Sequence, residues 1–544
     1  MAESMQAKLG RVRPPRVQIT YDVETGGAIE VKELPFIVGI LANLSGSPKV
    51  ALPPMRERNF VQIDRDNFDQ IMSAVCPRVV VKVDNKIPDA NGTTGSLNAE
   101  LIFRGIADFE PVPLIRKISK LHTLYRERSL LKDFLAKLDG NDALDGFLSN
   151  LLYPELVVAD ENASDEEKQQ IEASKTKFTG LRGSLASDLE ALKSSLDANV
   201  DAAKLKHVRE KLQKEIQKAL GKEDLELADL ENETLEETLP PEYFIQLQDT
   251  RARLAEIQTW QDIDGTDPAL EEERTELWQG IEIPESFQTV INEGKMIHDR
   301  SQTYYATILV GQFVESVLSK QKTPEDESDK NLPDATSLTT NHIAETDEII
   351  SRQVNLVMHD SKLQELEATW RGLHYLVMNT ETGPKLKLRV LNATKDDLHK
   401  DIMKAVEFDQ SALFKLVYEQ EYGTFGGDPY SVLIGDYQFG RAPTDMELLQ
   451  GIAGIAAAAH APFIAAAYAK LFDLDDFSKL YKPRDLSKIF ESAELIKWRS
   501  FRDSEDSRYV TLTLPRVLLR LPYGPDTVPV EGVNFQEDVD GTDA

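Results

Sequence analysis

A glycine-rich stretch at residues 422–440, YGTFGGDPYSVLIGDYQFG, constrains the fold of this chain more than any other segment. Glycine supplies backbone conformations that other residues rarely adopt, and residues 431–437 then form an apolar, β-branched run that is typical of a strand. Glycines can cradle a phosphate where a helix follows them, but a strand follows here and neither glycine motif of nucleotide-binding loops is present. We therefore predict a structural turn and not a phosphate site. Its turn residues are Gly423, Gly426, Gly427 and Pro429.

A second unusual block, residues 497–524, places alternating charges before a strand at residues 509–514 that stops at Pro515. Arginine and aspartate this close together could form a catalytic group, but guanidinium–carboxylate pairs also fix loops and subunit contacts. The block contains no histidine or cysteine to act as a base or nucleophile. We therefore predict loop-fixing or inter-subunit roles for its charges. They are Arg499, Arg502, Asp503, Glu505 and Arg508.

The acidic charge of the chain argues against a nucleic-acid partner. The chain of 544 residues carries a net charge of −31, from 93 acidic and 62 basic side chains, so it would repel a phosphate backbone. No apolar run approaches the roughly 18 residues that a membrane span needs, and residues 1–10 lack the apolar core of a signal peptide. We expect a soluble cytoplasmic protein with no nucleic-acid partner and no direct membrane insertion.

Metal and redox chemistry have no visible place in the sequence. Cys76 is the single cysteine, which excludes a disulfide within the chain and a zinc site built on several thiolates. The eight histidines are scattered, without an H-E-x-x-H motif. His460, within AAHAP, is predicted to be a buried core histidine and not a catalytic base. We expect no metal and no cofactor.

The first part of the chain predicts strands and then a helix. The strands are expected at residues 15–23, 34–44, 78–83 and 97–103. A helix is expected to begin at the sequence DFEP, residues 108–111, where an acidic residue can cap free N–H groups and proline needs no partner. Its apolar stripe includes Leu114, Ile118 and Leu121. Its solvent side is predicted to be basic, at Arg116, Lys117, Lys120, Arg126 and Arg128.

The middle of the chain is helical and acidic. Residues 175–220 predict one or two amphipathic helices, whereas residues 223–285 have a large excess of acidic side chains, typical of a solvated face or a flexible spacer. Another helix is expected at residues 301–319. A polar, proline-containing linker is expected to follow it at residues 320–340.

The last part alternates helices with strands. Helices are expected at residues 345–358, 361–378, 395–405 and 411–420, a strand with one wet face at 385–393, and an alanine-rich helical stretch at 448–467 that Pro462 interrupts. Strands alternating with helices in both halves predict a mixed α/β or α+β fold.

Several of these segments resemble one known system. Residues 348–377, 408–440, 456–467 and 498–524 resemble the large sheath subunit of bacterial type VI secretion systems, called TssC or VipB. Residues 21–46, 60–72 and 108–141 resemble the small sheath subunit of the same system, TssB or VipA. The resemblance covers about residues 12–152 for the small subunit and about 281–544 for the large one. The chain therefore resembles a fusion of two partners that the family keeps on separate chains.

The resemblance implies a division into domains. A small-subunit part at residues 1–156 is joined by a helical, acidic and partly flexible region at 157–280 to the N-terminal helix of the large-subunit part at 281–322. A flexible linker at 323–340 precedes the large-subunit body at 341–544, which we expect to be incomplete at its C-terminal end.

The resemblance also implies a function. Such subunits polymerise in the cytoplasm around an inner tube of Hcp-like rings, attach to a baseplate and contract to propel the tube. A ClpV-like AAA+ unfoldase then recycles the contracted sheath through an N-terminal helix of the large subunit. In this chain the equivalent helix carries Tyr305, Ile308, Leu309, Phe313 and Val317. Packing of this helix on its own subunit is the alternative interpretation.

Two other functions are alternatives to a type VI sheath subunit. A contractile sheath or baseplate protein of another, phage-tail-like injection system would assemble in a similar way. A hydrolase would need Asp436, His460 or the arginine–aspartate block to meet in a pocket, and no spacing predicts that. We therefore predict structural roles and no enzyme activity. The predicted core anchors are Trp370, Phe463 and Trp498, and the predicted backbone requirements are Gly426 and Gly427.

Overall fold

The structure is a computed structural model. It describes residues 22–25, 28–31, 35–87, 95–156, 165–220, 270–299, 302–321, 332–405, 407–422, 427–483 and 485–539, together with residues 230, 247, 250, 254, 257, 260 and 424. These residues fold as a mixture of helices and strands, which confirms the predicted fold class. In the part of the chain described, no helix combines the length and the apolar character needed to cross a membrane.

The chain divides into two compact units. Unit 1 consists of Met1–Ile118, Ser351–Glu531 and Phe535–Ala544, and unit 2 of Ser119–Ile350 and Gly532–Asn534. Unit 1 therefore takes segments from both ends of the sequence. The predicted domains are consecutive segments with boundaries near residues 156, 280, 322 and 340, and this division stays a prediction.

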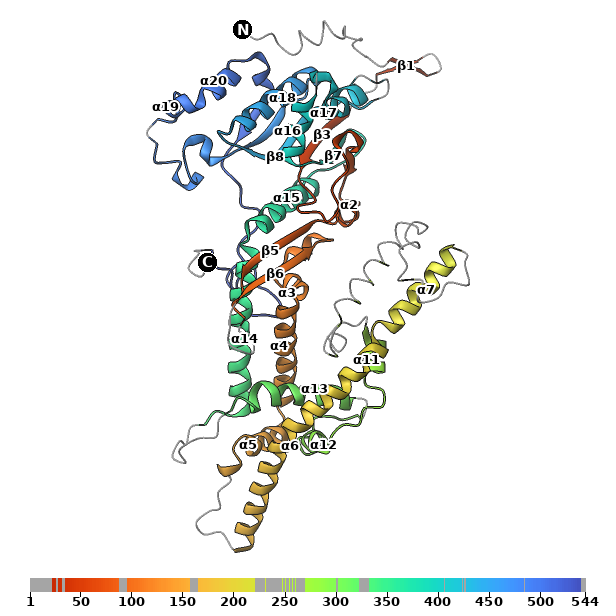
Figure 1. The fold of residues 1–544 in the computed structure, drawn as a ribbon, viewed down its shortest axis with the longest axis vertical. Coiled ribbons are helices and arrows are strands. Elements are labelled where there is room, and N and C mark those ends of the chain that lie inside the picture. The colour runs from red at the N-terminus through yellow and green to blue at the C-terminus, as the bar shows by residue number, and fades with distance from the viewer. Residues whose placement is uncertain are drawn as a thin grey trace. The chain divides into compact units, whose positions relative to one another are not determined.

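A six-stranded sheet forms the centre of unit 1 (Figure 1). Its order is β10-β9-β8-β3-β7-β4. The strand β3 (Phe36–Ala42) lies parallel to both of its neighbours, β7 (Leu386–Asn392) and β8 (Val432–Phe439). Every residue of β3 after the first is buried, as expected for an apolar strand that is covered on both faces. A strand from the first part of the sequence thus lies between two strands from the last part.

The remaining strands complete this sheet and form two small hairpins. On one side of the sheet lie β9 (Phe463–Ala467) and the edge strand β10 (Val510–Thr513), and on the other lies the antiparallel edge strand β4 (Val61–Ile63). Separately, β5 (Arg78–Asp84) pairs with β6 (Ser96–Ile102), and β1 (Asp22–Thr25) pairs with β2 (Ala28–Val31). The predicted strands at residues 34–44, 78–83 and 97–103 are confirmed, whereas most of the one at 15–23 lies outside the described residues.

Helices pack around the large sheet. The helix α18 contributes a nearly continuous buried face to the core that contains Ile37, Leu433 and Phe463. The helices of unit 1 are α2 (Phe68–Val75), α3 (Pro111–Lys117), α15 (Ser361–Met378), α16 (Lys395–Lys404), α17 (Ala412–Phe414), a π-helix (Lys415–Tyr422), α18 (Pro443–Ala459), α19 (Leu486–Ile489) and α20 (Ile496–Arg502).

Unit 2 is helical in its described part. Its helices are α4 (Ser119–Leu138), α5 (Asp142–Leu152), α6 (Asp165–Ala203), α7 (Lys206–Leu220), α11 (Glu271–Leu277), α12 (Glu285–Glu293), α13 (Thr303–Phe313) with a π-helical turn (Val314–Leu318), and the first part of α14 (Ala335–Met358). The predicted amphipathic helices at residues 175–220 are confirmed as α6 and α7. Because α14 begins at Ala335, it includes residues that we had assigned to a linker. Most of the acidic stretch at 223–285 lies outside the described residues.

Several local predictions were wrong. The helix expected from residue 108 is broken at Ile118, whose backbone is extended, so α3 and α4 are separate. Arg126 and Arg128, expected in solvent, are both buried. Both side chains have partners inside unit 2. The guanidinium of Arg126 lies 5.0 Å from the ring centre of Trp260, and Arg128 forms an ion pair with Asp347.

The alanine-rich stretch at residues 448–467 is only partly helical, contrary to the prediction. The helix ends at Ala459, and residues 463–467 form the strand β9 between β8 and β10 instead of continuing as helix. His460 caps the helix in the left-handed conformation, with φ of 55°, and is exposed. It is therefore not the buried core histidine that we predicted, because the end of the helix turns its side chain out of the core.

Candidate functional site

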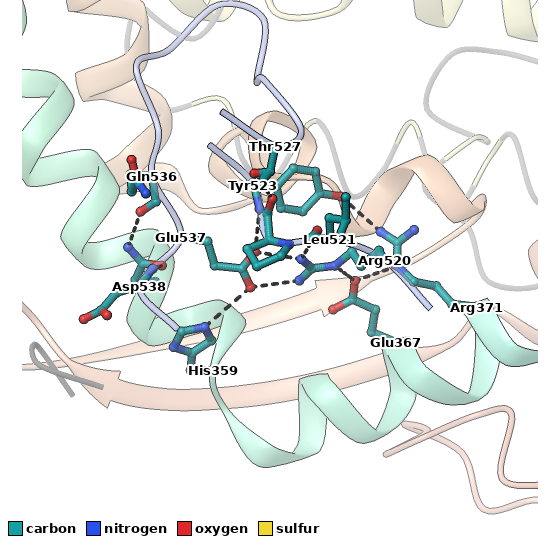
Figure 2. A network of polar contacts seen from close by, with 12 residues as sticks. His359, Glu367, Arg371, Arg520, Leu521, Tyr523, Thr527, Gln536, Glu537 and Asp538 are labelled. Carbon is teal, nitrogen blue, oxygen red and sulfur yellow. Dashed lines mark hydrogen bonds and ion pairs between the residues drawn. The ribbon is translucent and has the colours of Figure 1, made fainter. Parts of the chain in front are cut away.

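A cluster of charged and polar side chains in unit 1 brings together four segments, two within residues 359–371 and two within residues 520–538 (Figure 2). Arg520 follows the edge strand β10, and Glu367 and Arg371 lie one turn apart on α15. His359 lies between α14 and α15. The fourth segment, residues 535–538, contributes Glu537 and is called the strap below. We call the set of Glu367, Arg371, Arg520, Tyr523, Glu537 and His359 the Arg520 cluster.

The guanidinium of Arg520 occupies the centre of this cluster. Its Nη1 and Nη2 donate to the two carboxylate oxygens of Glu537 at 2.7 and 3.0 Å, and its Nε donates to Glu367 at 2.9 Å. The same guanidinium lies 4.6 Å from the ring centre of Tyr523. This bidentate geometry fits arginine and would not suit lysine. Burial opposes the charge, but Glu537 and Glu367 outweigh burial and raise the pKa of Arg520.

Glu537 is buried and has three partners. Besides Arg520, these are the backbone N–H of Tyr523 at 2.9 Å and His359, whose Nε2 lies 3.5 Å from the carboxylate. Burial by itself would raise the pKa of Glu537. The donors together outweigh burial and lower the pKa to about 2. Glu537 is therefore ionised throughout the physiological pH range.

The backbone of the strap adds further bonds. The N–H of Glu537 donates to the carbonyl of Tyr523 at 2.8 Å, and Asn355 of α14 bonds Gln536 and Asp538 on either side of it. Phe535 is almost fully buried. The strap is thus fixed to the end of α14 and to the segment that contains Arg520.

The chemistry available to the Arg520 cluster is structural. Both carboxylates are held by guanidinium groups, with Arg371 donating to Glu367 at 2.6 Å and to the Tyr523 hydroxyl at 3.2 Å. A carboxylate with a pKa near 2 is too weak a base to take a proton efficiently at neutral pH. The arrangement fastens segments of the chain to one another.

Removing the charge of Glu537 is expected to destabilise unit 1 in a pH-dependent way. The folded pKa of about 2 lies below the ordinary value of 4.5, so ionised Glu537 stabilises the fold fully above that ordinary value and loses this contribution as the pH falls toward 2. We expect Glu537→Gln to lower the free energy of unfolding by about 3 kcal/mol at pH 7 and by about half as much at pH 3. Urea unfolding at both pH values measures this.

The control for this prediction is Glu531→Gln, which neutralises an exposed carboxylate in the same part of the chain. It should change the free energy of unfolding by less than about 0.5 kcal/mol at either pH. Equal destabilisation by Glu537→Gln at pH 7 and pH 3 would contradict the linkage to the charge of Glu537.

The structure places the predicted anchors in different surroundings. Trp370 is fully buried and donates its indole N–H to the carbonyl of Leu44 at 3.0 Å, and Phe463 is fully buried beneath α18. Trp498 is partly buried between two apolar clusters. A Cβ on Gly427 would lie 2.2 Å from the carbonyl oxygen of Glu421, so this position needs glycine. Gly426 lies outside the described residues.

The five predicted charges do not form one group. Arg499 donates to the carbonyls of Phe490 and Ser492, both at 2.7 Å, which fixes the loop before α20. The side chains of the other four are exposed, and Arg508 lies 5.5 Å from the ring centre of Tyr509. Their inter-subunit role stays a prediction. The exposed residues are Arg502, Asp503, Glu505 and Arg508.

The helix predicted to contact an unfoldase packs inside unit 2. Four of its predicted contact residues are buried, and Phe313 stacks on Phe134 of α4 at 4.8 Å between ring centres. The Tyr305 hydroxyl donates to Asp133. An unfoldase could reach this face only after local opening, and the contact stays a prediction. The buried residues are Ile308, Leu309, Phe313 and Val317.

Sequence reasoning missed the Arg520 cluster. Its members come from four segments whose proximity depends on the tertiary fold. One signal was available: Arg520 interrupts the apolar run VLLRLP, and an arginine in such a position commonly has a carboxylate partner. The partner itself could not be deduced.

Comparison with known proteins shows where the chain belongs. Residues 340–544 match the VipB family model, described as EvpB/VC_A0108, tail sheath N-terminal domain, and residues 9–172 match the model of type VI secretion system VipA, VC_A0107 or Hcp2. The sheath protein TssB1 of Pseudomonas aeruginosa is 38% identical over 137 residues, which are 77% of its length and 25% of this chain. The chain belongs to the type VI secretion sheath family.

The large sheath subunit is represented less completely. The sheath protein TssC1 of Pseudomonas aeruginosa is 52% identical over 204 residues, which are 37% of this chain and 41% of TssC1. This type VI sheath chain thus joins a TssB-like part to a TssC-like part, as the resemblance implied, and it spans less than half the length of TssC1.

Proposed function

We propose that the chain is a structural subunit of a type VI contractile sheath. It would polymerise with copies of itself around an Hcp-like inner tube and contract to propel that tube. Membership of the sheath family supports this proposal. Non-closing head-to-tail contacts between copies would produce the helical polymer.

The observation that best supports this function is a sheet shared by the two parts of the chain. The strand β3 lies in the TssB-like part, and both of its neighbours, β7 and β8, lie in the TssC-like part. The sheet therefore needs both parts, and one chain supplies them in one subunit. A chain that merely carried two independent domains would have no reason to share a buried strand.

The remaining partners follow from the proposal. A baseplate would nucleate the polymer, a ClpV-like AAA+ unfoldase would recycle it, and the assembly would work in the cytoplasm. The relatives are named as sheath proteins, and the ion pairs of the Arg520 cluster serve the fold, so we propose a mechanical role without enzyme activity.

Electron microscopy of the assembled material tests the proposal. The chain is co-expressed with an Hcp-like tube protein and with the region of TssC1 that follows its 204 matched residues. We expect hollow helical tubes in which both proteins co-sediment with the chain. Stable complexes that never form tubes, where TssB1 and TssC1 do under the same conditions, would contradict the sheath function.

A further inference from the structure

An apolar segment of unit 1 is presented to solvent. Val517 is 81% exposed and Leu518 73%, and the neighbouring leucines are also exposed. Consecutive exposed apolar side chains are rare on a soluble domain and usually mark an interaction site. We call residues 514–521 the apolar strip. Its exposed apolar members are Leu514, Val517, Leu518, Leu519 and Leu521.

The apolar strip is fixed at both ends. Near its start Arg516 donates to the side chain of Gln438 on β8 at 2.9 Å. Near its end Arg520 is held by Glu367 and Glu537, and Figure 2 shows Leu521 beside this cluster. The strip is thus presented in a defined position by a cluster that has no catalytic chemistry of its own.

The backbone of the strip is also free of partners within the described part of the chain. Among the described residues, none bonds the backbone N–H or C=O groups of residues 516–519. The strip continues directly from β10, which is an edge strand of the large sheet. Unpaired backbone beside a sheet edge accepts an added strand.

The order of the side chains indicates how the strip is covered. In a strand, Val517 and Leu519 would lie on one face and Leu518 on the other. An apolar run of this kind is typical of a strand that is buried on both faces. Its partner must therefore supply a strand for the backbone and apolar cover for both faces, which a single amphipathic helix cannot do.

We propose that the apolar strip is the docking site of the C-terminal sheath domain. The matched family model is described as the N-terminal domain of the tail sheath, and the chain spans 41% of TssC1, so TssC1 extends well beyond the matched region. That domain would add a strand to residues 516–519 and cover both faces. The inference rests on family membership and does not require the chain to form tubes.

Binding in trans tests this inference. The chain of 544 residues is co-expressed with a tagged form of the TssC1 region that follows the matched residues. We expect capture in a 1:1 ratio and at least tenfold slower hydrogen exchange at residues 516–519 in the complex. The double variant V517D/L518D should reduce capture at least tenfold, because it places two charges in the interface.

The control is Val50→Asp, since Val50 is also 81% exposed and lies in unit 1 outside the strip. It should capture as well as the unchanged chain, and all three proteins should melt within about 2 °C of one another because the substituted side chains are exposed. Equal capture by V517D/L518D, or no capture by the unchanged chain, would overturn the inference. So would a dimer of the chain alone that V517D/L518D converts to monomer, because the occupant would then be a second copy.

The tube-formation test and the capture test can give opposite results, so each proposal can be contradicted without the other. Capture without tubes would contradict the sheath function and leave the docking site standing. Tubes that form equally well with V517D/L518D would contradict the docking site and leave the sheath function standing.

Discussion

Replacing Ile40 with Asp is expected to unfold unit 1. Ile40 lies at the centre of β3, is 4% exposed and pairs with Val390 of β7 and Ile434 of β8. The variant loses apolar packing worth about 2–5 kcal/mol, and a buried carboxylate without a partner costs several kcal/mol more. The sum approaches the whole stability of an ordinary domain, about 5–15 kcal/mol. Circular dichroism and urea unfolding measure the loss.

The matched control is Val61→Asp. Val61 is also β-branched, but it lies on the edge strand β4 and is 50% exposed, so the new carboxylate stays in water. We expect it to cost less than about 1 kcal/mol. If Ile40→Asp melted at the temperature of the unchanged chain, β3 would not be an inner strand shared by the TssB-like and TssC-like parts, and the main support for one joint subunit would be lost.

The same strand shows what sequence can and cannot predict. The apolar run at residues 34–44 predicts a strand that is buried on both faces, and β3 confirms it. Its neighbours were not predictable, because strand pairing across most of the chain depends on tertiary packing. Gly39 illustrates the difference: a Cβ there would lie 2.8 Å from both Leu433 and Tyr430, a close approach that exists only in the folded sheet.

The alanine-rich segment shows tertiary packing overriding local preference. Residues 463–467, FIAAA, carry three alanines, which favour helix in isolation. The segment forms β9 because β8 and β10 each pair with it in parallel, one on either side. Small side chains suit this inner position, where bulkier ones would need more room. Propensity is a weak guide where a sheet offers hydrogen bonds to both edges.

The candidate site was the least predictable part. Within the charged block at residues 497–524, we selected charges between residues 499 and 508 because they are close in sequence, yet the buried cluster is centred on Arg520 of the same block. Arg499 binds carbonyl groups of its own loop, and the other four selected charges are exposed. Proximity in sequence therefore selected mostly exposed residues, whereas burial and distant partners define the cluster that fixes the apolar strip.

Removing Arg128 is expected to destabilise unit 2 strongly. Arg128 of α4 forms a bidentate pair with Asp347 of α14, with N–O distances of 2.8 and 3.1 Å, and both side chains are buried. Arg128→Ala leaves the carboxylate of Asp347 in the interior without its partner. Breaking one side of a buried ion pair typically costs about 3–5 kcal/mol. Thermal and urea unfolding of the variant measure the change.

A double variant separates the charge pair from simple packing. In R128M/D347L both charges are replaced by apolar side chains, so no buried charge is left unpaired, and stability should return to within about 1–2 kcal/mol of the unchanged chain. Lys132→Ala removes an exposed cation from the same helix and should cost less than about 0.5 kcal/mol. If the double variant were as unstable as Arg128→Ala, the loss would come from packing volume. The ion pair would then not be what holds α4 against α14.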